Sequence, residues 1–130
     1  MAQKRKIFSK KTRQAVFDRY RRHCAYCGCK FTSIKEMQID HIKSRLVSRF
    51  RGEPVDDSIA NLMPACRQCN FYKSAKGIEG FRKALKDTLS RTCRQSFQVR
   101  LAMKYGMLQY KDWDGEFYFE NFDSVEAGSE

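Results

Sequence analysis

Two pairs of cysteines constrain the fold of this chain more than any other feature. Cys24 and Cys27 form one C-x-x-C pair, and Cys66 and Cys69 form a second. Two thiolates at this spacing can converge on one side of a tight turn, and two such turns complete a tetrahedral zinc site. We therefore expect one structural zinc ion to hold the two turns, here called knuckles, together and to contribute folding free energy.

Other uses of the cysteines fit less well. A redox-active dithiol is one alternative, but neither pair lies in a βαβ pattern. A disulfide framework is disfavoured because the basic start of the chain is not followed by the apolar stretch of an export signal. Cys29, Cys93 and His23 are not expected to be ligands. Cys29 in particular would need a C-x4-C pairing that breaks the symmetry between the knuckles.

Charge points to a polyanionic partner. The chain has 130 residues and a formal net charge of +11. Residues 1–110 hold 25 of the 26 basic side chains and 8 of the 15 acidic ones, whereas residues 111–130 are acidic. Such a surplus attracts nucleic acid through phosphate contacts and counterion release, although a solvated basic surface is the alternative. No apolar run of about 18 residues exists, so we expect a cytoplasmic protein, bacterial or phage-like, with no membrane partner.

The hydrophobic pattern predicts a small α+β domain with helices added at its C-terminal end. Period-two alternation over residues 37–42 predicts a strand that ends at Asp40 and His41. The further expected elements are a basic flexible arm over 1–11, an amphipathic helix over 12–22, a loop or irregular second strand over 43–57, a helix after the second knuckle, helices around 81–89 and 97–108, an edge strand over 116–122 and a disordered acidic tail over 123–130.

Three polar residues near the knuckles suggest hydrolytic chemistry. The Asp40 carboxylate is a hard oxygen donor suited to Mg²⁺ or Mn²⁺, and His41 can take a proton from water near neutral pH. Asn70 directly follows the last knuckle cysteine, and its amide oxygen could be a second ligand of the catalytic ion. Singly, each residue is more typical of a structural role; together they favour phosphodiester hydrolysis.

The order C-x-x-C, Asp-His, Asn-Leu, C-x-x-C-Asn resembles the zinc-containing branch of the HNH endonucleases. The resemblance covers about residues 12–76 and implies a ββα-metal core stapled by the four-cysteine zinc site, with residues 77–122 as a C-terminal extension. It implies that His41 activates the attacking water and that Asp40 and Asn70 bind one divalent ion. It also implies that Asn61 braces the loop and the orientation of His41, and that Lys73 lies near the DNA backbone.

The segment after Asp-His departs from the family pattern, because it has a single glycine, Gly52, and several arginines. We expect Arg45, Arg49 and Arg51 to touch phosphate, with a solvated face as the alternative, and Arg67 joins these candidates. The resulting prediction is a DNA endonuclease. The alternatives are a non-catalytic zinc-ribbon module that binds DNA or RNA, and a small interaction protein whose C-terminal half docks a protein partner. The oligomeric state is left open.

Overall fold

The computed structural model describes residues 7–122, which divide into two compact units. The first unit contains residues 7–75 and 117–122, and the second contains residues 76–116. Most of the expected basic arm and the whole expected tail, residues 123–130, lie outside the described residues. Within residues 7–122, no helix combines the length and apolarity needed to cross a membrane.

The N-terminal helix α1 spans Lys10–Asp18 and begins where the Ser9 hydroxyl accepts a hydrogen bond from the Thr12 N–H at 3.1 Å. Its apolar stripe buries Val16 and Phe17. The helix ends four residues earlier than the periodicity predicts, because the chain must turn into the first knuckle. Arg21 and Arg22 both adopt positive φ there, a conformation that cannot continue a right-handed helix.

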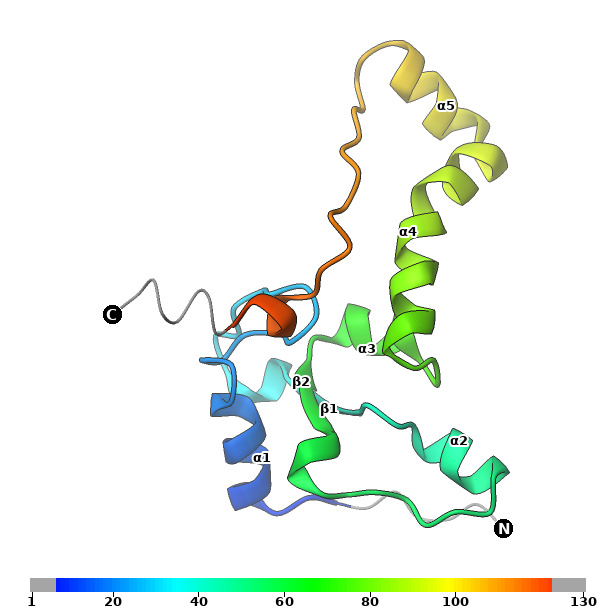
Figure 1. The fold of residues 1–130 in the computed structure, drawn as a ribbon. Coiled ribbons are helices and arrows are strands. Elements are labelled where there is room, and N and C mark those ends of the chain that lie inside the picture. The colour runs from blue at the N-terminus through cyan, green and yellow to red at the C-terminus, as the bar shows by residue number, and fades with distance from the viewer. Residues whose placement is uncertain (1–6, 123–130) are drawn as a thin grey trace. The chain divides into compact units, whose positions relative to one another are not determined.

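A two-stranded antiparallel sheet and one helix form the centre of the first unit (Figure 1). Strand β1 spans Gln38–His41 and pairs with β2, Leu62–Ala65, so that His41 lies opposite Leu62. The helix α3, Arg67–Lys73, follows β2 directly, with Cys66 as its N-cap. This arrangement has the predicted α+β class and agrees with a ββα-metal fold.

The segment between the two strands differs from expectation. Instead of a loop or an irregular second strand over residues 43–57, the chain forms the helix α2, Arg45–Phe50. The Ser44 hydroxyl caps this helix by accepting from the Val47 N–H at 3.0 Å. The partner strand lies later, at β2, because its four residues are all buried and supply the apolar surface that a core strand needs. The short 3₁₀ helices η1, Ile34–Glu36, and η2, Ile59–Asn61, precede β1 and β2 respectively.

The end of the described chain returns to the first knuckle. Residues 118–122 are helical, so the predicted edge strand over 116–122 is wrong. The Tyr118 and Phe119 N–H groups donate to the carbonyls of Tyr26 and Ala25 at 3.0 and 2.7 Å. Tyr118 also packs on Gly28, where a Cβ would lie 2.7 Å from the tyrosine ring and where φ is +78°. Only glycine fits this position of the knuckle without strain.

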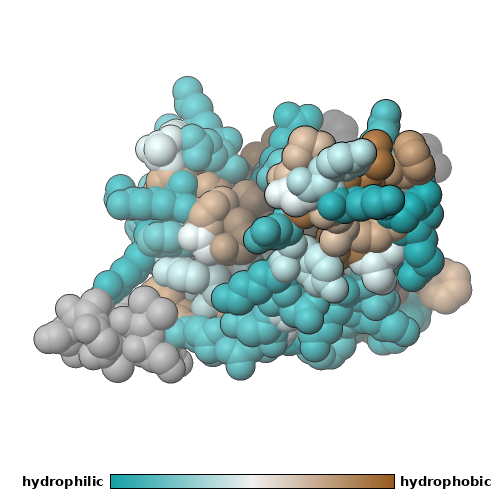
Figure 2. Space-filling model, turned by 90° about the horizontal axis from the view of Figure 1, so that it is seen from above, coloured by the Kyte–Doolittle hydropathy of each residue, from teal (hydrophilic) through white to brown (hydrophobic). Residues whose placement is uncertain are grey.

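The second unit contains two helices, α4 over Ile78–Gln95 and α5 over Phe97–Lys104, in the two regions where the sequence predicts them. The Ser96 hydroxyl caps α5 by accepting from the Val99 N–H at 3.2 Å. The Arg82 guanidinium donates to the Gly115 carbonyl and pairs with Glu79. Apolar side chains remain exposed in this unit. The most exposed of them are Phe97, Tyr105, Met107 and Tyr110. The face of the molecule drawn in Figure 2 carries apolar groups between hydrophilic ones.

Candidate active site and metal centre

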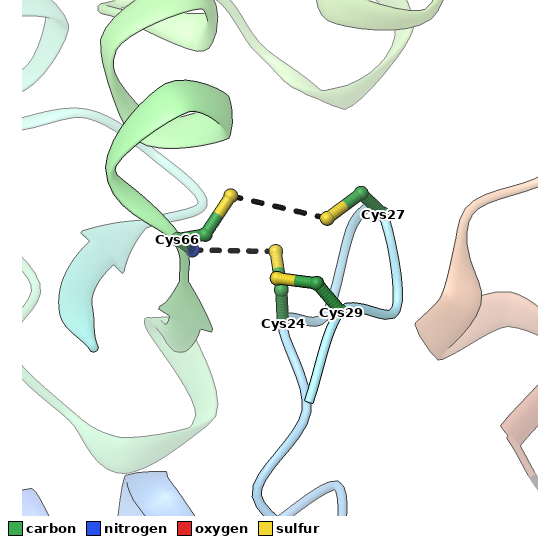
Figure 3. Close-up of side chains that lie close together, drawn as sticks. All are labelled: Cys24, Cys27, Cys29 and Cys66. Carbon is green, nitrogen blue, oxygen red and sulfur yellow. Dashed lines mark hydrogen bonds between the residues drawn. The ribbon is translucent and has the colours of Figure 1, made fainter. Parts of the chain in front are cut away.

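Cysteine thiols from both knuckles gather at one place. The sulfur atoms of Cys24, Cys27, Cys29 and Cys66 all lie within 4.8 Å of one another, and Figure 3 shows them pointing into one shared space. The sulfurs of Cys27 and Cys66 are 3.8 Å apart. This is the edge of a tetrahedron whose centre lies about 2.3 Å from each corner, the usual Zn–S distance. The cluster therefore has the dimensions of a zinc site.

The ligand set of this cluster is less simple than the two C-x-x-C pairs predict. Cys29 belongs to the compact group of four sulfurs, although the sequence argues against it as a ligand. The predicted ligand Cys69 also reaches the cluster, since its thiol hydrogen-bonds with the thiols of Cys24 and Cys27. Five thiols thus surround a site that would take four, and the structure brings all four predicted ligands close together.

The thiols strongly influence one another's protonation. Hydrogen bonds with Cys24 and then Cys69 lower the pKa of the Cys27 thiol to about 3. Hydrogen bonds with Cys24 and, to a smaller extent, Cys27 raise the pKa of the Cys69 thiol. Burial raises the pKa of the Cys29 thiol. Closely packed thiols cannot all ionise without a compensating charge. A divalent cation would supply that charge, so the donor set fits zinc.

Asp40 lies in a buried polar network beside this centre. Its carboxylate is 4% exposed and accepts from the Tyr26 hydroxyl at 2.5 Å. The Lys73 ammonium lies 3.1 Å from Oδ2 of Asp40 and also donates to the His41 carbonyl at 3.1 Å. Burial raises the pKa of Asp40, and the Lys73 charge and the Tyr26 hydrogen bond oppose this rise. Burial also raises the pKa of Tyr26, so its hydroxyl stays protonated and donates.

The position of Lys73 corrects one prediction. Lys73 is 0% exposed, because the end of α3 packs its side chain against β1. A fully buried ammonium that already pairs with a carboxylate cannot reach a DNA phosphate. Lys73 therefore neutralises Asp40 within the protein, and it is not a contact for the DNA backbone.

Asp40, His41 and Asn70 line one surface pocket of about 380 Å³. The Asn70 amide donates from Nδ2 to the Gln38 side-chain oxygen at 2.6 Å, which orients the group. Within residues 7–122 its Oδ1 has no hydrogen-bond partner, and the Asp40 oxygens retain lone pairs beyond the bonds they accept. These oxygens fit a hard divalent cation such as Mg²⁺. Exposed apolar side chains, Leu46 and Phe71, complete the wall of the pocket.

His41 has a partner that the sequence analysis misses. Its Nε2 lies 2.7 Å from Oδ1 of Asp57, a residue in the connection between α2 and η2. The Phe8 ring lies 5.9 Å from the imidazole, tilted by 41°. The side chain of His41 is 11% exposed, and it lines both this pocket and a neighbouring one of about 370 Å³.

Asn61 is buried and joins the two chain segments that flank α2. Its Oδ1 accepts from the Lys43 N–H at 2.9 Å, and its Nδ2 donates to the carbonyls of Lys43 and Asp56 at 3.2 and 2.8 Å. Its own carbonyl accepts from the Ile42 N–H. The amide therefore ties the residues after His41 to the connection that carries Asp57.

The predicted arginines lie in two groups. Arg45, at the start of α2, lines both pockets together with His41 and Asn70. Its Nε is shielded from solvent and has no hydrogen-bond partner among residues 7–122. Arg49, Arg51 and Arg67 are exposed and line neither of these pockets.

Comparison with known protein families gives one match, at the centre of this site. Residues 24–76 match the model of the HNH endonuclease family, a segment that runs from the first knuckle to three residues beyond α3. The match covers residues 24–76 only, and these residues are called the HNH segment below. The comparisons with curated proteins and with solved structures gave no significant match. The HNH segment contains both knuckles, Asp40, His41, Asn61 and Asn70, whereas the second unit lies outside it from residue 77 on.

Two residues of the site, Asp57 and Tyr26, do not follow from the sequence. Both bond to residues that the sequence does predict, His41 and Asp40. Asp57 is not predictable from its neighbours, because acidic residues are common in the polar connections between helices and strands. Tyr26 lies between two predicted zinc ligands, and no sequence pattern indicates that its hydroxyl bonds to Asp40.

Proposed function

We propose that this chain is a metal-dependent DNA endonuclease that hydrolyses phosphodiester bonds with His41 as general base. The observation that carries the proposal is that an imidazole, a carboxylate and an amide from β1 and α3 line one pocket of an HNH segment. Arg45 lines the same pocket, where its guanidinium would bind the phosphate that is cleaved.

Each residue of the pocket would have its own role in the reaction. His41 would accept the proton of the attacking water, a role worth roughly 10²–10⁴ in rate. Asp40 and Asn70 would hold a divalent cation, Mg²⁺ or Mn²⁺, whose charge stabilises the leaving oxygen. Arg45 would hold the phosphate in line with the imidazole. The cysteine cluster would hold zinc for folding only, since four thiolates leave no open coordination position.

Basic side chains outside the pocket would hold the duplex. Arg49, Arg51 and Arg67 are exposed in the HNH segment, and their charge is available for phosphate contacts that position DNA without reading its sequence. A cytoplasmic location belongs to this proposal, because reducing conditions keep thiol ligands available to zinc.

A plasmid-cleavage assay with Mg²⁺ or Mn²⁺ tests the proposal. The His41→Ala variant should lose cleavage by roughly 10²-fold or more, while retaining zinc and DNA affinity. The matched control is His23→Gln, because His23 is the other histidine and stacks on Tyr118 away from both pockets. Cleavage by His41→Ala at the wild-type rate would refute the proposal. If the wild-type protein binds DNA but does not cleave it with either Mg²⁺ or Mn²⁺, the result would favour the non-catalytic zinc-ribbon module.

A protein partner for the C-terminal half is a second part of the proposal. It is supported by the large apolar side chains that the second unit leaves exposed, among them Phe97 and Met107. Size-exclusion chromatography with light scattering would detect self-association, which Phe97→Ser should weaken. Leu46→Ser is the control, because it also replaces an exposed apolar side chain by serine but lies in the first unit.

A further inference from the structure

The Asp57–His41 contact joins residues that are 16 positions apart in the chain. The two side chains are 22% and 11% exposed, and the Nε2–Oδ1 distance of 2.7 Å is that of a strong charge-assisted hydrogen bond. An ionised carboxylate can only accept hydrogen bonds. Nε2 of His41 must therefore carry the proton in this contact.

This assignment fixes the state of the other ring nitrogen. A neutral imidazole carries one proton, so a proton on Nε2 leaves the lone pair on Nδ1. Within residues 7–122, no hydrogen bond is found at Nδ1 of His41. The contact thus leaves Nδ1 free to accept a proton, which a general base requires.

The connection that carries Asp57 is itself held in place. The Asp56 carbonyl accepts from the Asn61 amide at 2.8 Å, and Oδ1 of Asp56 accepts from the Ser58 N–H at 2.9 Å. Asp57 lies between these two anchors. Because hydrogen bonds hold the residues on both sides of Asp57, its carboxylate stays close to His41.

We propose that Asp57 is a positioning residue that holds His41 in the Nε2–H tautomer, so that Nδ1 is the base of the hydrolytic reaction. This inference rests on the proposed nuclease function for its catalytic consequence, but the tautomer can be measured without any cleavage. Asp57 touches neither the attacking water nor the phosphate in this assignment, and it acts through the imidazole alone.

The test compares the full-length, zinc-loaded wild-type protein with Asp57→Asn. An asparagine has a similar size, but its amide can either accept from or donate to Nε2, so the preference for one tautomer is lost. Asp56→Asn is the matched control. It removes one negative charge from the same connection and keeps the oxygen that accepts from Ser58.

Two measurements decide the outcome. Long-range ¹H–¹⁵N spectra of the neutral imidazole, recorded without Mg²⁺, give the tautomer, and only two histidines need assignment. The wild-type and Asp56→Asn proteins should show Nε2–H, and Asp57→Asn should show a substantial Nδ1–H population. In cleavage assays, Asp57→Asn should lower kcat by about 10²-fold and leave KM for DNA nearly unchanged.

An Nδ1–H tautomer in the wild-type protein, or an unchanged tautomer in Asp57→Asn, would overturn the inference. A wild-type kcat in Asp57→Asn would overturn it as well. If the wild-type protein does not cleave DNA, the nuclease function fails, and the spectra alone then decide whether Asp57 sets the tautomer.

Discussion

Lys73 and Asp40 place two opposite charges in the interior of the protein. The lysine is 0% exposed, and its ammonium contacts the carboxylate and the His41 carbonyl. Such a pair gives little net stability over an apolar pair, but removing one partner leaves a buried charge with poor compensation. The pair also links the last turn of α3 to the end of β1, where the candidate catalytic residues lie.

Replacing the lysine alone should therefore cost stability. We expect Lys73→Met to lower the free energy of unfolding by about 3–5 kcal/mol, measured by urea denaturation of the zinc-loaded protein. Lys35→Met, at an exposed lysine, should stay within about 0.5 kcal/mol of wild type. Adding Asp40→Asn to Lys73→Met should recover part of the loss, because no charge then remains buried. Equal stability of Lys73→Met and Lys35→Met would contradict the buried pair.

The five thiols at the knuckles permit a test of which four bind zinc. The C-x-x-C spacing favours Cys69, while the most compact group of sulfurs contains Cys29. We expect Cys29→Ser to keep about one equivalent of zinc and Cys69→Ser to lose affinity, because Cys69 starts from the rigid first turn of α3. Zinc analysis after dialysis against a chelator measures this. The reverse order of the two variants would assign Cys29 as the fourth ligand.

Among the helices and strands, α2 is the element that differs most from the prediction made from the sequence. It has six residues, Arg45–Phe50, and places Arg45 in the wall of both pockets. A helix this short has little intrinsic stability, so its cap and its packing decide whether it forms. The Ser44 hydroxyl satisfies the Val47 N–H, and Ser48 is fully buried on the inner face.

Removing the cap should weaken α2. We expect Ser44→Ala to lower the free energy of unfolding by about 1 kcal/mol, since the Val47 N–H loses its partner. Ser58→Ala is a suitable control, because Ser58 precedes η2 at the same kind of position and its side chain makes no capping bond. Thermal and urea unfolding of both variants provide the comparison. Similar losses in the two proteins would show that the Ser44 bond contributes nothing.

At the scale of the whole molecule, the first unit has a small apolar core that depends on its knuckles. Both knuckles, the sheet, α1 and residues 117–122 belong to this unit. The backbone of the first knuckle bonds to β2 through Ala25 and Pro64 and to the end of the chain through Tyr26 and Tyr118. Small domains often need a metal or another cross-link in addition to their core.

Removing zinc should therefore unfold the first unit. We expect a strong chelator to abolish hydrogen-exchange protection of the β1 and β2 amides, because in small zinc modules the metal contributes about 10 kcal/mol or more to folding. Readdition of zinc should restore protection, whereas Mg²⁺ should not, since thiolates prefer zinc. Protection that persists in demonstrably zinc-free protein would refute the structural role of the metal.

Short-range sequence patterns were enough to predict the residue types that meet at the candidate site. Two C-x-x-C pairs, an Asp-His pair at the end of a strand and an asparagine after the last cysteine are short-range patterns of residue type and spacing. From them followed the HNH resemblance and three of the residues that line the pocket, Asp40, His41 and Asn70, while the hydrophobic pattern predicted the α+β class. The helices α4 and α5 were predictable for the same reason, because amphipathic periodicity is a local property.

The partners that these residues meet became visible in the folded chain alone. Asp57 lies beside His41, Lys73 is buried on Asp40, and Cys29 joins the thiol cluster. The first two contacts join residues 16 and 33 positions apart. Their pairing depends on the register of β1 and β2 and on the course of the α2 connection, which no local pattern encodes. For Cys29, the turn of the first knuckle and the approach of the second decide how close its sulfur lies to the others.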